Sequence, residues 1–175
     1  KDNAPKWNPA TPEGVTDKEA LDESVRVLLE ISDRFKEYRV KFAFEFLGFS
    51  WCSVSTLEED FAIIKAVNRG NIGLVLDTFH FYAGGSSIGA IRNVAPEKIF
   101  ILHMNDAEKL PKAELQDAHR LFPGEGVIPL GEIVAGLKNI HYDGPVSLEM
   151  FRPAYWILTP EEVATKGINA IRKFL

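Results

Sequence analysis

Four residues with side chains that commonly bind metals stand at the ends of four short hydrophobic segments. Glu45, Asp77, His103 and Glu149 each close a segment rich in valine, isoleucine, leucine and phenylalanine. Three carboxylates and one imidazole form a donor set typical of divalent cations such as Mn²⁺, Zn²⁺, Co²⁺ and Mg²⁺. The segments cover residues 40–45, 72–77, 99–103 and 145–149.

The positions of these segments predict that the four side chains meet. Helix-start signals of the form Thr-x-x-Glu begin at Thr16, Thr56 and Thr159. Strands that alternate with helices are typical of a parallel sheet covered by helices. Because parallel strands end at one rim, we expect the four metal-ligand candidates to converge there. The expected helices cover residues 16–37, 56–67, 87–94, 130–140 and the segment after 159.

Side-chain alternation favours a barrel over an open, doubly wound sheet. In each segment the metal-ligand candidate lies on one face and large apolar residues lie on the other. A (β/α)₈ barrel needs eight strands and about 250 residues, whereas the sequence offers four strands in 175 residues. We therefore predict an α/β fold, the C-terminal half (four β/α units) of a TIM barrel, as one partial domain over residues 1–175. Lys1 would follow a missing strand. A long loop, 105–129, is expected to be either functional or disordered.

Composition excludes several classes of protein. The net charge of −5 and the lack of a basic run argue against a nucleic-acid partner. No apolar stretch approaches the roughly 20 residues that cross a membrane, and the polar, proline-rich residues 1–14 do not resemble a signal peptide. The lone Cys52 is typical of a reducing compartment, so we expect a cytoplasmic protein.

Five further polar residues lie near the strand ends. His80 follows Asp77 by three residues and is interpreted as facing the substrate or the metal ligands. Arg120 would either grip substrate oxygens or pair with a nearby acid, Glu125 or Asp117. Arg152, just after Glu149, would either reach the pocket or brace its loop. The remaining two, Asn105 and Asp106, are expected to contact His103 from outside the metal site.

Five runs of residues resemble the xylose isomerase-like TIM barrels, the sugar phosphate isomerase/epimerase superfamily, and within it the inosose isomerases most closely. The resemblance extends from about Thr16 to the end of the chain. It implies a single divalent metal held by Glu45, Asp77, His103 and Glu149, with His80 contacting the substrate. It also implies that the two glutamates flank the substrate as catalytic residues. The runs are FAFEFLG, GLVLDTFHF, IFILHMND, HRLFPGEGVIPL and VSLEMFRPAYW.

The expected activity is isomerisation or epimerisation of a small-molecule keto-polyol or sugar, such as inosose, by proton transfer through a cis-enediolate. An inosose dehydratase, a hydroxypyruvate isomerase or a ketose 3-epimerase would share the first chemical step. An endonuclease IV-like enzyme would need three zinc ions and a positive surface, which four histidines and the negative charge oppose. A non-catalytic metal- or polyol-binding protein stays open, as does a homo-oligomer. The missing first half of the barrel would be a further partner.

Overall fold

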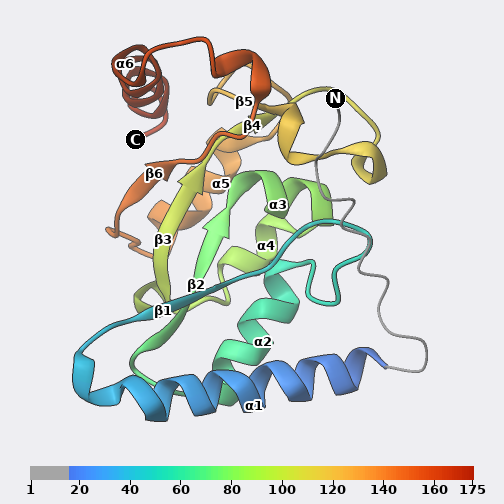
Figure 1. Ribbon diagram of the computed structural model, residues 1–175, viewed down its shortest axis with the longest axis vertical. Helices are drawn as coiled ribbons and strands as arrows, with labels where there is room; N and C mark the ends of the chain where they lie inside the picture. Colours follow the sequence, from blue (N-terminus) through green and yellow to red (C-terminus); the bar gives the residue numbers. More distant parts are fainter. Residues whose placement is uncertain (1–15) are drawn as a thin grey trace.

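A four-stranded parallel sheet forms the centre of the protein in the computed structural model, which describes residues 16–175 (Figure 1). The strand order is β1-β2-β3-β6. The proline-rich residues 1–14, and with them the prediction about a signal peptide, lie outside the described residues. The strands are β1 (Phe42–Glu45), β2 (Ile72–Asp77), β3 (Ile99–Met104) and β6 (Val146–Leu148).

The register of the sheet places the predicted metal ligands on one face. Asp77 pairs with His103, and His103 pairs with Ser147, two residues before Glu149. Side-chain alternation along residues 99–103 predicts that Ile99 and Ile101 share the face of His103, and for Ile99 this prediction is wrong. Ile99 pairs with Leu74, but the next paired position joins Ile101 to Val75, so the register shifts within β3. Ile99 therefore lies on the buried, helix-covered face, while His103 keeps its place beside Asp77.

The helices begin where the sequence predicts. Thr16, Thr56 and Thr159 each form a complete capping box with the glutamate three residues later. The buried faces of α2 and α5 pack with β2 and β3 into one hydrophobic core. In Figure 1, α1 and α6 lie at opposite ends of the molecule. The helices are α1 (Asp17–Phe35), α2 (Leu57–Val67), α3 (Thr78–Gly84), α4 (Ile88–Ile91), α5 (Leu130–Asn139) and α6 (Pro160–Ile171).

Two segments differ from the prediction. Residues 78–84, which lie outside every expected helix, form the short helix α3, whose N-cap is Asp77. The predicted long loop 105–129 contains a two-stranded antiparallel sheet, β4 (Asp106–Ala107) and β5 (Arg120–Leu121), and short 3₁₀ turns. Both segments lie beyond the carboxyl ends of strands and shape the rim. Among the described residues, no helix is long and apolar enough to span a membrane.

Candidate metal centre

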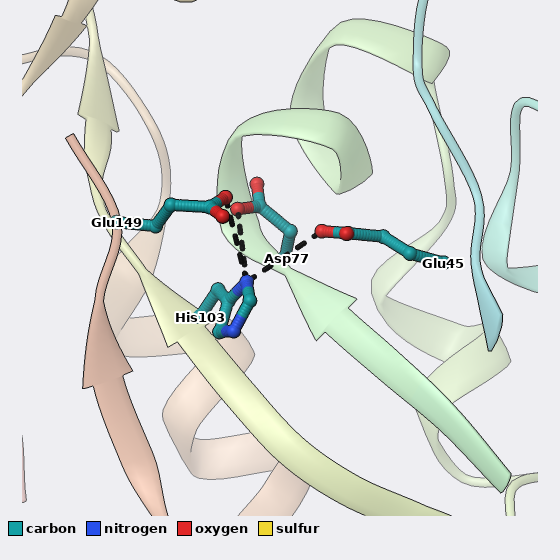
Figure 2. A group of neighbouring side chains, drawn as sticks. All are labelled: Glu45, Asp77, His103 and Glu149. Atoms are coloured by element: carbon teal, nitrogen blue, oxygen red, sulfur yellow. Dashed lines mark ion pairs between the residues drawn. The ribbon is translucent and has the colours of Figure 1, made fainter. Parts of the chain in front are cut away.

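The side chains of Glu45, Asp77, His103 and Glu149 point to one common point beyond the carboxyl ends of the strands (Figure 2). One donor atom from each lies within 4.8 Å of the donor atoms of the other three. His103 Nδ1 is 3.6 Å from a carboxylate oxygen of Glu45 and 3.4 Å from one of Glu149. The structure thus brings together all four predicted metal ligands.

Two of the donor atoms also lack the hydrogen-bond partners that buried polar atoms normally have. Glu45 Oε1 and His103 Nδ1 are buried without a hydrogen-bond partner among the described residues. A buried polar atom without a partner is costly unless another group satisfies it. A cation held by the four side chains would satisfy both atoms.

The carboxylates around His103 control its protonation. The carboxylates of Glu149 and, next, Glu45 lie 3.4 and 3.6 Å from His103 Nδ1, favour the protonated ring and raise the pKa of His103 to about 10. Only the neutral imidazole binds a metal, so a cation must displace this proton. Metal binding is therefore expected to release a proton at neutral pH.

Arg120 is a buried cation beside two of the four ligands. Its Nη1 donates to Asp77 Oδ2 at 2.6 Å and to Glu149 Oε2 at 3.2 Å. Its Nε and Nη2 contact Asp117 Oδ1 at 3.0 and 2.9 Å, which is the acid pairing considered above. The guanidinium lies near the rings of Phe79 and Phe151, at 4.8 and 5.3 Å from their centres. Through these contacts Arg120 holds the carboxylates of Asp77, Glu149 and Asp117.

Asp77 is the most firmly held of the four. Its Oδ1 accepts from the backbone N–H of His80, and its Oδ2 accepts from Asn105 Nδ2 at 2.9 Å. Burial by itself raises the pKa of Asp77, but the charge of Arg120 and the hydrogen bonds outweigh burial and lower it below the usual value. Asn105 therefore contacts a ligand from outside the cluster, as predicted, although that ligand is Asp77 rather than His103.

Asp106 has a different role from the predicted one. Its carboxylate accepts hydrogen bonds from four backbone N–H groups, and three of these belong to the loop that follows β5. A Cβ on Gly126 would lie 2.2 Å from Ala107 O, so only glycine allows this close packing. Asp106 therefore fixes the loop next to Arg120 and does not contact His103. The four donors are the N–H groups of Ala107, Gly124, Gly126 and Ile128.

His80 is buried and lies between Arg120 and the loop after β1. Its Nδ1 accepts from the backbone N–H of Gly48 at 3.2 Å. Burial lowers the pKa of His80, so the ring is neutral and carries its proton on Nε2. Nε2 lies 3.0 Å from Arg120 Nη2, so two donors face each other there. An acceptor atom from a ligand would relieve this contact.

Arg152 lies in the loop after Glu149 and braces neighbouring loops. It forms an ion pair with Glu108 and a 3.4 Å hydrogen bond to Ala118 O. These contacts are the ones expected if Arg152 braces its loop instead of reaching the pocket. The predicted substrate contact of Arg152 is not among them.

Comparison with known proteins agrees with this geometry. The family model described as "Xylose isomerase-like TIM barrel" matches residues 4–174. The chain belongs to the xylose isomerase-like TIM barrel family. The parallel sheet and covering helices are accordingly of the TIM-barrel type.

Three relatives indicate where the chain falls within this family. The inosose isomerase of Bacillus subtilis (strain 168) is 44% identical over 152 residues, which cover 87% of this chain and 55% of the relative. The D-psicose 3-epimerase of Ruminiclostridium cellulolyticum is 31% identical, over 74% of this chain and 41% of the relative. A crystal structure of the IOLI protein with a binding zinc atom superposes with a TM-score of 0.90 and is 40% identical. That superposition covers 95% of this chain and 61% of the other. The chain spans about half the length of the curated relatives it matches.

The sequence analysis missed a buried acid whose carboxyl group is influenced by the charge of Glu45. Asp60, on the buried face of α2, is 0% exposed, and neither of its side-chain oxygens has a hydrogen-bond partner among the described residues. Burial raises the pKa of Asp60 well above its usual value, and the charge of Glu45 raises it further. The signal was visible in the sequence, because Asp60 interrupts the apolar positions Leu57, Ile64 and Val67.

Replacing Asp60 with asparagine should stabilise the protein at neutral pH. Folding raises the pKa of this carboxyl group. Its full contribution to the free energy of unfolding is therefore present only below its pKa in the unfolded chain, which is about 3.8. Above that pH the wild type loses up to about 1.4 kcal/mol of stability per pH unit, until the folded pKa is reached. The neutral amide of the D60N variant causes no such loss. Urea unfolding between pH 4 and 8 measures this effect. The free energy of unfolding of D60N should exceed that of the wild type by an amount that grows with pH. A difference that does not change with pH would show that folding does not raise the pKa of Asp60.

Proposed function

We propose that the protein is a divalent-metal-dependent isomerase or epimerase of a keto-polyol such as inosose, which moves a proton through a cis-enediolate. The observation that carries the proposal is the placement of Glu45 and Glu149. The two carboxylates approach the common point from opposite sides, with His103 between them (Figure 2). The similarity to inosose isomerases supports the same reaction.

The two glutamates can divide the proton transfer between them. One carboxylate takes the proton from the hydroxyl-bearing carbon beside the carbonyl, and the electron pair of the broken C–H bond forms the enediolate. The other glutamate, protonated from solvent, then delivers a proton to the former carbonyl carbon while the hydroxyl proton moves between the two oxygens, and the first glutamate returns its proton to solvent. A bound divalent ion stabilises the negative charge that develops on the substrate oxygens.

Other residues of the chain position these groups. Asp77 and His103 would complete the metal site, and Arg120 holds the carboxylates of Asp77 and Glu149 in place. His80 offers its Nε2–H to a substrate oxygen, because its Nδ1 is occupied as the acceptor of the Gly48 N–H. A substrate contact of Arg120 is proposed only for the Nη2 group that faces His80.

The identity of the ion and the extent of the barrel belong to the same proposal. A single ion from the group Zn²⁺, Mn²⁺, Co²⁺ and Mg²⁺ fits the donor set, and the zinc atom of the similar IOLI structure supports zinc.

We further propose that residues 1–175 form the partial domain predicted from sequence, a C-terminal half barrel. The four strands of the described sheet, against eight in a closed barrel, support this proposal.

Hydrogen exchange tests the reaction. The protein with zinc or manganese should incorporate deuterium from D₂O next to the carbonyl of 2-keto-myo-inositol, and removing the metal with a chelator should stop the exchange. E45Q and E149Q should lose exchange, whereas E161Q, a change of an exposed glutamate on α6, should not. Tight substrate binding with no exchange in the wild type would instead indicate a non-catalytic binding protein.

A ketose 3-epimerase is the second candidate. The 31% identity to a D-psicose 3-epimerase favours it, and the same pair of glutamates could remove a proton and replace it on one carbon. Measuring turnover of D-psicose beside 2-keto-myo-inositol separates the two activities.

A further inference from the structure

The Arg120 guanidinium has a third carboxylate partner besides the two metal-ligand candidates. Its Nη1 donates to Asp77 and Glu149. Asp117 Oδ1 accepts from Nε at 3.0 Å and lies 2.9 Å from Nη2. A guanidinium is planar, and its N–H groups form a rigid fork. Carboxylates on two edges of this fork fix the direction of every N–H group, and Asp117 fixes the direction of Nη2.

Asp117 differs from the other two partners because it is not one of the four residues whose donor atoms meet. A bound cation would attract the carboxylate oxygens of Asp77 and Glu149 and compete with Arg120 for them. It would leave the contact between Asp117 and Arg120 unchanged. Asp117 is therefore the partner that can hold Arg120 in the same place with and without the cation.

The Nη2 group that Asp117 holds lies beside a second donor. Arg120 Nη2 is 3.0 Å from His80 Nε2. The ring of His80 is fixed from its other side, where Nδ1 accepts from the backbone N–H of Gly48 at 3.2 Å. Two N–H groups at this distance cannot satisfy each other, but one oxygen atom placed beside the pair can accept from both.

The turn that carries Asp117 is itself held on both sides. Asp117–His119 form a short 3₁₀ turn between the metal-ligand strand β3 and β5. The backbone N–H of Glu108 donates to His119 O at 3.1 Å, and Arg152 donates to Ala118 O at 3.4 Å. Asp117 thus reaches Arg120 from a fixed backbone rather than from a free loop.

We propose that Asp117 is a positioning residue that acts through Arg120: it holds Nη2 beside His80 Nε2, so that the two N–H groups bind one oxygen of the substrate. Donors that already point to the place of the oxygen need no reorganisation when the substrate binds. Without Asp117, the guanidinium can turn about its Nη1 contacts, and Nη2 moves away from the competing donor of His80. The inference rests on the proposed function and adds a residue to that site.

Kinetics of Asp117 variants test this role in the zinc-loaded protein. D117A should lower kcat/KM for 2-keto-myo-inositol by about tenfold, the scale of one hydrogen bond to a charged group. Zinc content should not change, because Asp117 is not a ligand candidate. D117N keeps an oxygen that can accept from Nε and Nη2, so it should lose less. The matched control is D22A on α1, where Asp22 pairs with Lys18 in solvent, and it should behave as wild type.

A double-mutant cycle separates positioning from a general structural role. If Asp117 acts only through Arg120, D117A should change kcat/KM by less than about twofold when it is added to R120Q. A second tenfold loss in the R120Q background would overturn the proposal. So would a kcat/KM of D117A within about twofold of wild type, or an equal loss in D22A.

Nuclear magnetic resonance tests the contact without relying on activity. The ¹H–¹⁵N signal of Arg120 Nε–H is assigned by its loss in R120Q. It should shift and exchange faster with water in D117A and stay unchanged in D22A, and an unchanged signal in D117A would overturn the proposal. If the wild type turns over neither ketone, the proposed function fails, and this signal still decides whether Asp117 holds Arg120. If the wild type is active and D117A behaves as wild type, only the role of Asp117 fails.

Discussion

Replacing Glu149 with glutamine is expected to lower kcat for 2-keto-myo-inositol by about a thousandfold, the scale of a lost general acid or base. The amide of glutamine cannot accept a proton from carbon at neutral pH. Its NH₂ group would also face Arg120 Nη1, which now donates to Glu149 Oε2 at 3.2 Å. Steady-state kinetics at saturating zinc, with zinc content measured in the same samples, separates lost chemistry from lost metal.

The control for this change is E161Q on α6, which alters an exposed glutamate and should keep wild-type kcat. E45Q should lose activity on the same scale, because the proposed mechanism needs a carboxyl group that can gain and lose a proton on each side of the substrate. A kcat of E149Q within about tenfold of wild type, with zinc bound, would show that Glu149 does not carry the proton.

Replacing Arg120 with glutamine is expected to lower the free energy of unfolding by about 3–5 kcal/mol, because it leaves a buried carboxylate without its partner. Arg120 is 1% exposed and Asp77 is 0% exposed, so water cannot compensate the lost ion pair. A zinc ion bound by the four side chains would give Asp77 a new positive partner. Added zinc should therefore restore about 2–3 kcal/mol when it is present at about a hundred times its dissociation constant.

Urea unfolding with and without zinc measures both effects of R120Q. The matched control is R26Q on α1, where Arg26 pairs with Glu23 and Glu30 in solvent and contributes little to stability. If R120Q costs no more stability than R26Q, the guanidinium does not hold the carboxylates.

The convergence of four ligand candidates could be predicted because it depends on local patterns. Short apolar segments mark the strands, and threonine capping boxes mark the starts of α1, α2 and α6. Parallel pairing then fixes the rim on which the strand ends meet. The register shift at Phe100 did not disturb this result, because it lies before His103 on β3.

The helix α3 could not be predicted from periodicity. It has only seven residues, five of which are buried, so it shows no exposed polar face. Its start is set by Asp77, whose side chain accepts from His80 N while also belonging to the metal-ligand cluster. One residue thus ends a strand, caps a helix and faces the site.

The roles of Arg120 and Asp106 depend on contacts between distant segments. Arg120 lies 43 residues from Asp77 in sequence, and Asp106 lies 20 residues from Gly126. Sequence patterns identified both as polar residues near the rim. Only the folded loop shows that Arg120 supports the ligands and that Asp106 anchors the segment beside it.

Anomalous diffraction from crystals grown with zinc tests the central claim most directly. We expect one strong zinc peak at the point where the four side chains meet, within about 2.0–2.2 Å of a donor atom from each of Glu45, Asp77, His103 and Glu149. A zinc ion bound elsewhere, or one touched by fewer than three of these residues, would contradict the account.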